Sequence, residues 1–328
     1  MKNILAVVLL VMLTPYCGAC QNKFEIRSDT ILKSITSKFH GLSAIEYIPR
    51  TEEWILANDR GHYFKFRNCN NVRDFNRGNL SEDIRTDYYF ESVRYDSIRD
   101  AYFFSVETDT YTGVYSSIGQ LHAPNPRVII KLPLPSKNKG VEGIALSPSG
   151  ALWIAAEAGW ESGTDIANEI VYFYRYKNPL VDNDQEQPER FKYKIRRYDA
   201  DAVDKSDRPG GISEILAVDE NCLLVLERCY IKQPGGNPNR VFAQIRSVTV
   251  NSKTHELEPN DTLNFDFSSV PVVCNVEGMA WGDLQKQTLF VIADDGLGDD
   301  YFSDEVDPKT GRASVPTLRN QMIVLKRK

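Results

Sequence analysis

Residues 140–159 read GVEGIALSPSGALWIAAEAG, and this stretch decides the fold. Two short apolar runs flank the turn-forming sequence SPSG, which is typical of two antiparallel β-strands joined by a tight turn. A carboxylate stands near each end, with Glu142 before the first run and Glu157 after the second. We interpret the stretch as one copy of a unit that the chain repeats around an axis.

The same layout occurs five times along the chain. The copies begin at the apolar residues Leu42, Phe90, Val141, Ile212 and Val276. Each copy ends in an acid after its second apolar run, and these acids are Asp59, Glu107, Glu157, Glu227 and Asp294, with Asp295 beside the last. Repeats of roughly fifty residues, each supplying a few short strands, are typical of a β-propeller.

The two ends of the chain carry further strand candidates, at residues 24–35 and 322–325. Five copies leave a sixth blade to be formed, and pairing of the two terminal strands would close the ring. The sequence therefore predicts an all-β fold, a six-bladed β-propeller closed by its N- and C-terminal strands, with five or seven blades as the alternatives. Residues 21–328 are expected to form this single domain.

Residues 1–20 have the anatomy of a secretory signal peptide. Lys2 precedes an apolar run at residues 4–13, which is too short to cross a bilayer by itself, and small residues then lead to Cys20. Two alternatives stay open, lipidation of Cys20 and simple cleavage. The protein is thus expected to be exported, as a periplasmic or cell-envelope lipoprotein or as a secreted protein, with membrane contact only through a lipid on Cys20.

Four cysteines remain after the signal peptide, namely Cys69, Cys222, Cys229 and Cys274. Export permits disulfides among them. Cys222 and Cys229 lie on one apparent strand, too far apart for a disulfide with each other. The sequence leaves the actual pairing open, and four small buried thiols are an equal alternative.

The net charge of the chain is −6, with 45 acidic and 39 basic residues. Proteins that bind nucleic acid usually gather Lys and Arg on one surface, so this balance argues against nucleic acid as a partner. Acidic concavities attract cations instead. We expect a monomer that acts on a small molecule.

Three short motifs carry a family resemblance: VEGIA at residues 141–145, VEGMAWG at 276–282 and GLSAI at 41–45. With the acids that end the repeats, the chain resembles the secreted phytase-like family whose domain is called "esterase-like activity of phytase", over residues 39–326. The resemblance implies a six-bladed propeller. By distant similarity to the β-propeller phytases, it also implies calcium-dependent hydrolysis of phosphoesters.

The repeats predict where the chemistry would occur. Glu142 and Glu277 begin the inner strands of two copies, and Arg60 and Arg228 follow two of the terminal acids, so we expect these four to be catalytic. The terminal acids would form a ring at one mouth of the channel. Oxygen ligands without His or Cys suit Ca²⁺, so the predicted metal ligands are Asp59, Glu107, Glu157, Glu227, Asp294 and Asp295. The structural alternative is that these groups orient strand ends and blades.

Other catalytic classes find little support in the sequence. It contains no HExxH motif, and Gly41-Leu42-Ser43-Ala44-Ile45 lacks the second glycine of a GxSxG nucleophile motif. Two hypotheses remain. The first is an exported calcium-dependent phosphoesterase that takes a phosphoester or another anionic substrate, and the second is a non-catalytic propeller that binds a ligand or protein at the cell envelope.

Overall fold

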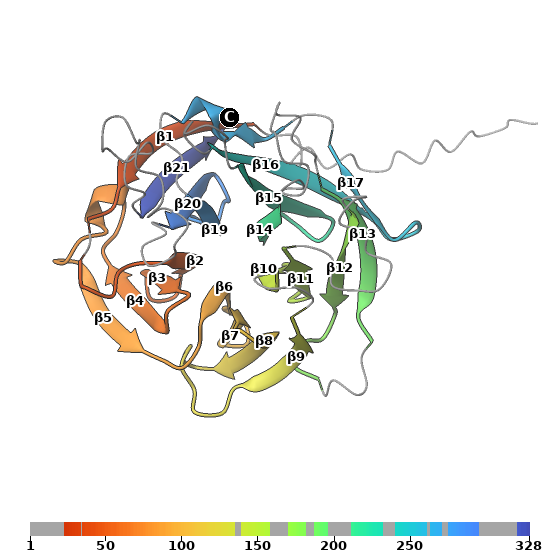
Figure 1. The fold of residues 1–328 in the computed structure, drawn as a ribbon, viewed down its shortest axis with the longest axis horizontal. Coiled ribbons are helices and arrows are strands. Elements are labelled where there is room, and N and C mark those ends of the chain that lie inside the picture. Colours follow the sequence, from red (N-terminus) through yellow and green to blue (C-terminus); the bar gives the residue numbers. More distant parts are fainter. Residues whose placement is uncertain are drawn as a thin grey trace, which may run out of the picture.

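In the computed structural model, four-stranded antiparallel sheets stand side by side around a central axis (Figure 1). The chain is therefore an all-β propeller, as predicted. Within the described part of the chain, no helix is long and apolar enough to span a membrane. The structure describes residues 23–33, 35–134, 139–157, 170–181, 187–195, 211–231, 240–260, 263–270, 275–294 and 320–328.

Three blades are separate four-stranded sheets, and the other two are joined through their outer strands into one nine-stranded sheet. In every blade the strands follow one another from the axis outward (Figure 1). Blade 1 contains β2 (Leu42–Ile48), β3 (Glu53–Asn58), β4 (His62–Arg67) and β5 (Leu80–Arg85). Blade 2 contains β6 (Phe90–Asp96), β7 (Ala101–Glu107), β8 (Tyr111–Ile118) and β9 (Arg127–Pro133). Blade 3 contains β10 (Val141–Leu146), β11 (Leu152–Ala156), β12 (Ile170–Tyr176) and β13 (Glu189–Lys194).

Blades 4 and 5 follow the same plan. Blade 4 contains β14 (Gly211–Ala217), β15 (Cys222–Ile231), β16 (Arg240–Asn251) and β17 (Glu256–Pro259), with β18 (Phe265–Asp266) beside β16. Blade 5 contains β19 (Asn275–Trp281), β20 (Thr288–Asp294), β21 (Gln321–Arg327) and β1 (Phe24–Ile31). Two short 3-10 helices, η2 (Val72–Asp74) and η6 (Phe267–Ser269), lie between strands. A parallel bridge from Lys192 to Glu256 joins the outer strands of blades 3 and 4.

The ring is closed by the two terminal strands, as predicted. Strand β1 pairs antiparallel with β21, from Phe24 opposite Arg327 to Ile31 opposite Gln321, and β21 pairs with β20. These strands complete the sheet of the fifth repeat and do not form a sheet of their own. The described residues therefore form five blades, which corrects the expected six in favour of the five-bladed alternative.

The hydrophobic core lies between the blades, in five clusters that each join two neighbouring blades. Strand β3 shows how the sequence builds them. Trp54 and Leu56 pack toward blade 5, whereas the alternate residues Ile55 and Ala57 pack toward blade 2. Because side chains alternate along a strand and both faces are covered, the strands near the axis are nearly continuous apolar runs.

Every inner strand carries a β-bulge within its first three residues. The register shifts there in β2, β6, β10, β14 and β19. The glycine after the bulge in the two VEG motifs has a packing reason. A Cβ on Gly143 would lie 2.8 Å from the backbone nitrogen of Ile215, and one on Gly278 would lie 2.7 Å from the carbonyl oxygen of Ser43. These glycines let adjacent inner strands approach closely.

The described cysteines bear out one prediction. Cys222 is disulfide-bonded, whereas Cys69 and Cys229 are buried and outside any disulfide. Cys222 and Cys229 lie on the same strand, β15, and do not bond to each other. Cys274 lies outside the described residues.

Candidate functional site

The terminal acids of four repeats occupy one equivalent position, at the end of the second strand of their blade. Three donate their backbone N–H to the residue before the inner strand: Asp59 to Gly41 (3.1 Å), Glu107 to Tyr89 (3.2 Å) and Glu157 to Gly140 (2.9 Å). Asp294 lies opposite Asn275 in the strand register. The bulge residues Glu91, Glu142 and Glu277 lie at the same end of their own inner strands.

Blade 4 departs from this pattern. The residue opposite Gly211 is Arg228, so the arginine takes the position that an acid takes in the other blades. Glu227 precedes it and projects to the other side of the strand. There it is fully buried, accepting a hydrogen bond from the Tyr193 hydroxyl at 2.6 Å and another from the Gln244 amide. The structure therefore corrects the placement of Glu227 in the predicted ring and puts a cation there.

Arg228 interacts electrostatically with Glu277, Glu157 and Glu142, and Glu91 and Glu107 interact in turn with acids of this group. We call these six residues the inner cluster: Glu91, Glu107, Glu142, Glu157, Glu277 and Arg228. The Arg228 guanidinium bonds to Glu277 of blade 5 and lies 3.7 Å from Glu157 of blade 3. Lys139 contacts Glu157 at 2.7 Å. The cluster is thus held together by partners from different blades.

Glu107 also has a structural partner, because it accepts the backbone N–H of Gly140 at 2.5 Å. A Cβ at Gly140 would lie only 2.3 Å from the Glu107 Oε2. Only glycine leaves room for this carboxylate at the start of blade 3. This contact agrees with the structural alternative, in which acids of the ring orient neighbouring blades.

Burial, together with repulsion between neighbouring acids, shifts the pKa values of four carboxyls of the cluster upward. Burial, followed by the charges of neighbouring acids, raises the pKa of Glu91 and of Glu142 well above the ordinary carboxyl range. Burial raises the pKa of Glu277 to about 7 despite the opposing charge of Arg228. Burial likewise raises the pKa of Glu107 to about 7, although the hydrogen bond from Gly140 opposes it. The cluster thus contains carboxyls that hold their protons to different degrees near neutral pH.

The remaining predicted residues lie at the margin of the cluster or outside the described chain. Asp59 contributes to the raised pKa values of Glu91 and Glu277. Arg60 lies 3.5 Å from the carboxylate of Asp59, and its side chain is 37% exposed. Asp294 is buried at the end of β20. Asp295 is not among the described residues.

Calcium requires several oxygen ligands around one point. Among the described residues, no three Asp, Glu, His or Cys side chains are grouped closely enough to hold a metal ion. Arg228 and Lys139 already supply positive charge at the place where the predicted ring of acids would bind a cation. The predicted ligands that the structure describes do not form a calcium site by themselves, so calcium binding stays a prediction.

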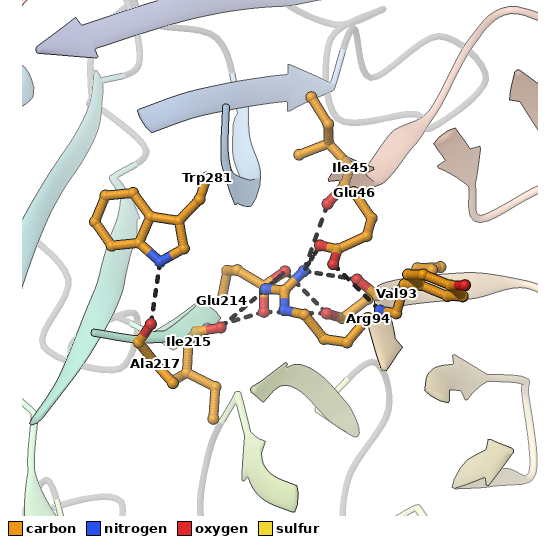
Figure 2. Close-up of polar contacts among 10 residues, drawn as sticks. Ile45, Glu46, Val93, Arg94, Glu214, Ile215, Ala217 and Trp281 are labelled. Atoms are coloured by element: carbon orange, nitrogen blue, oxygen red, sulfur yellow. Dashed lines mark hydrogen bonds and ion pairs between the residues drawn. The ribbon is translucent and has the colours of Figure 1, made fainter. Parts of the chain in front are cut away.

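A second buried charge network crosses the axis, and the sequence interpretation missed it (Figure 2). Arg94 projects from β6 of blade 2, and its guanidinium lies 2.8 Å from Glu214 of blade 4 and 3.5 Å from Glu46 of blade 1. It also donates hydrogen bonds to the carbonyl oxygens of Val93 (2.7 Å) and Ile215 (2.9 Å). The network ties three inner strands together.

The partners of Arg94 are themselves held in place. Glu214 accepts the Ser92 hydroxyl at 2.9 Å, and Glu46 accepts the backbone N–H of Tyr95 at 3.2 Å. Burial raises the pKa of Glu46 and of Glu214 to about 7 against the lowering effect of Arg94. A sequence signal existed, because Glu46 and Arg94 are oppositely charged residues at the same position of neighbouring repeats, inside apolar runs.

Replacing Glu107 with glutamine is expected to flatten the dependence of stability on pH. The folded-state pKa of Glu107 lies above its ordinary value of 4.5, so its favourable contribution is complete below about pH 4.5 and is lost as pH rises through 7. Glutamine keeps an oxygen for the Gly140 N–H without the charge. At pH 8 the variant should be about 2 kcal/mol more stable than wild type, with little difference at pH 4.5.

Urea unfolding at a series of pH values between 4.5 and 8 measures this effect. Glu82→Gln is the matched control, because Glu82 is a half-exposed acid on the outer strand β5 that pairs with Lys65 at 2.9 Å. If the free energies of unfolding of Glu107→Gln and wild type changed in parallel with pH, the raised pKa of Glu107 would be contradicted.

A family model described as "Phytase-like: Esterase-like activity of phytase" matches residues 37–297. No curated protein sequence matches the chain.

Several solved structures resemble the chain in shape at low sequence identity. A glucose dehydrogenase has a TM-score of 0.49 at 9% identity, covering 91% of this chain and 99% of its own. The putative oxidoreductase (glucose dehydrogenase) from Thermus thermophilus has a TM-score of 0.46 at 10% identity, covering 93% and 99%. The RRP9 WD40 repeats have a TM-score of 0.42 at 8% identity, covering 93% and 100%. The fold assignment rests on the strand pairing of this chain.

Proposed function

Because the chain belongs to the phytase-like family described by "esterase-like activity of phytase", we propose that it hydrolyses phosphoesters at the inner cluster. One observation carries the proposal. Glu142 and Glu277 occupy the same bulge position in blades 3 and 5, share the field of Arg228, and differ in how strongly they hold a proton. Pairs of carboxyls whose environments separate their pKa values are suited to act as acid and base.

The proposed roles follow from these environments. Glu142, whose pKa is raised well above the ordinary range, is protonated at neutral pH and donates its proton to the leaving alcohol. Glu277 has a pKa of about 7 beside Arg228, so it is partly ionised and accepts a proton from water. Arg228 stabilises the negative charge that develops on the phosphoryl oxygens. Arg60, at the exposed margin beside Asp59, is proposed to steer an anionic substrate toward the cluster.

The direct test is turnover of a panel of phosphomonoesters and phosphodiesters by the purified protein, with calcium and with a chelator. We expect hydrolysis of at least one member of the panel. The calcium prediction expects activity and melting temperature to rise together when calcium is added. Turnover that persists in chelator supports the acid–base roles without metal, and no turnover of any member with calcium present would refute the phosphoesterase proposal.

A second candidate function is favoured by the internal pairing of the cluster. Glu277 with Arg228, Glu157 with Lys139, and Glu107 with the Gly140 N–H are all contacts that a purely structural cluster would make. In this alternative the propeller binds a ligand or protein at the cell envelope without turning it over. A single reproducible product that is lost in Glu142→Gln would exclude this alternative.

Export and a monomeric state are proposed from the sequence. The signal-like residues 1–20 lie outside the described chain. Mass spectrometry of the mature N-terminus separates a lipid on Cys20 from simple cleavage, and an unprocessed Met1 would contradict export.

A further inference from the structure

The five inner strands do not all carry the same residue type at their bulge. Three hold glutamate, whereas Ser43 in blade 1 and Ser213 in blade 4 are serines. The Ser43 hydroxyl donates a hydrogen bond to the Gly41 carbonyl oxygen at 3.3 Å. The Ser213 Oγ is buried and makes no hydrogen bond to any of the described residues, and Ser213 is only 1% exposed.

A buried hydroxyl without a partner is costly, by about 1 to 3 kcal/mol. Such groups in folded proteins are usually satisfied by an ordered water or a ligand. Among the described residues, the Ser213 hydroxyl makes no hydrogen bond that would stabilise the fold. A hydroxyl at this buried position therefore indicates that a small hydrogen-bonding molecule binds to Ser213.

The position of Ser213 is central to the inner cluster. Blade 4 stands between blade 3, which supplies Glu142, and blade 5, which supplies Glu277, and these two glutamates act on each other electrostatically across it. Two residues before Ser213, a Cβ at Gly211 would lie 2.6 Å from the Glu157 Oε1. Gly211 also lies opposite Arg228. Ser213 thus lies at the bulge of the inner strand that stands between the strand of the proposed acid and the strand of the proposed base (Figure 1), and the cation lies on the adjacent strand of its own blade.

We propose that Ser213 is a positioning residue that holds the nucleophilic water of the cluster between Glu142 and Glu277. This inference rests on the proposed phosphoesterase function. The water oxygen forms the new bond to phosphorus while the bond from phosphorus to the leaving oxygen breaks. One water proton passes to the Glu277 carboxylate, and the Glu142 carboxyl gives its proton to the leaving alcohol, so the step needs no further reactant.

The kinetic test compares Ser213→Ala with Ser43→Ala, which removes the serine hydroxyl that already has a partner at the same bulge position. Ser213→Ala should lower kcat about 10-fold or more with KM within about twofold of wild type, because the water loses its placement and the substrate contacts remain. Ser213→Thr keeps a hydroxyl and should recover much of the rate. Equal kcat values for Ser213→Ala and Ser43→Ala would overturn the inference.

A second measurement does not depend on turnover. A high-resolution crystal structure of the wild-type protein should contain an ordered water within hydrogen-bond distance of the Ser213 Oγ, and the Ser213→Ala crystal should lose it. A wild-type crystal in which a protein group bonds to that oxygen would overturn the inference even if the enzyme is active. A wild type that has the water but hydrolyses no ester would instead refute the proposed function.

Discussion

Replacing Arg94 with methionine should lower the free energy of unfolding by about 3 to 5 kcal/mol at pH 8, the largest effect on stability that we expect from a single change in this chain. Methionine fills a similar volume but leaves the buried Glu214 and the partly buried Glu46 without their counter-charge. It also removes the donors to the carbonyl oxygens of Val93 and Ile215. Three blades lose their common contact at once.

The loss of unfolding free energy in Arg94→Met should also depend on pH. Arg94 lowers the pKa of both glutamates against the effect of burial, so removing it raises their pKa values above about 7. A raised folded-state pKa means stability that is lost as pH increases, so the deficit of the variant should grow from pH 5 to pH 8. At pH 5 both carboxyls are already neutral and the deficit should be less than half as large.

Urea unfolding at the two pH values measures both statements. Arg50→Met is the control, because Arg50 contacts Asp100 at 2.7 Å on the surface and should cost less than about 1 kcal/mol. Adding Glu214→Gln to Arg94→Met should recover part of the loss at pH 8. A deficit below about 1 kcal/mol at pH 8, or one independent of pH, would contradict the role of Arg94.

Changing Glu142 to glutamine should reduce kcat about 100- to 1000-fold on whichever phosphoester the protein hydrolyses. Glutamine has nearly the same shape but has no acidic proton for the leaving alcohol. The pH–rate profile should also lose the limb that belongs to the acid, while the limb of Glu277 remains. The effect should be largest for substrates with a poorly acidic leaving alcohol, which depend most on protonation.

Steady-state kinetics on such an alkyl phosphate and on an aryl phosphate test the assignment. Glu227→Gln is the matched control, because Glu227 is a buried glutamate of blade 4 that faces Tyr193 and lies outside the inner cluster. Its kcat should stay within about threefold of wild type in protein that remains folded. Equal losses in the two variants would show that burial of a glutamate, and not proton donation, accounts for the effect.

The fold was predictable from the sequence because each repeat carries its own strand and turn signals. The number of blades was not predictable, because the sequence of a terminal strand indicates that the strand must pair but does not indicate which sheet it joins. β1 and β21 complete the sheet begun by β19 and β20, so the fifth repeat and the closing strands form one blade.

The members of the candidate site were predictable only where strand register follows sequence spacing. Glu107 and Glu157 end their strands as expected, but in blade 4 the same position belongs to Arg228, one residue beyond Glu227. The number of residues that separates two positions in the sequence does not determine which residues lie opposite each other in the paired strands. The hydrogen bonding of Ser43 and of Ser213 likewise differs at equivalent positions, which no spacing reveals.

The closing pair of strands has a consequence for the order of biosynthesis. Strand β1 (Phe24–Ile31) leaves the ribosome long before its partner β21 (Gln321–Arg327) has been made. Contacts this distant in sequence form late, because a long loop must close first. Strand β1 therefore waits without its sheet until β21 has been synthesised, and we expect the ring to become resistant to proteolysis only after that.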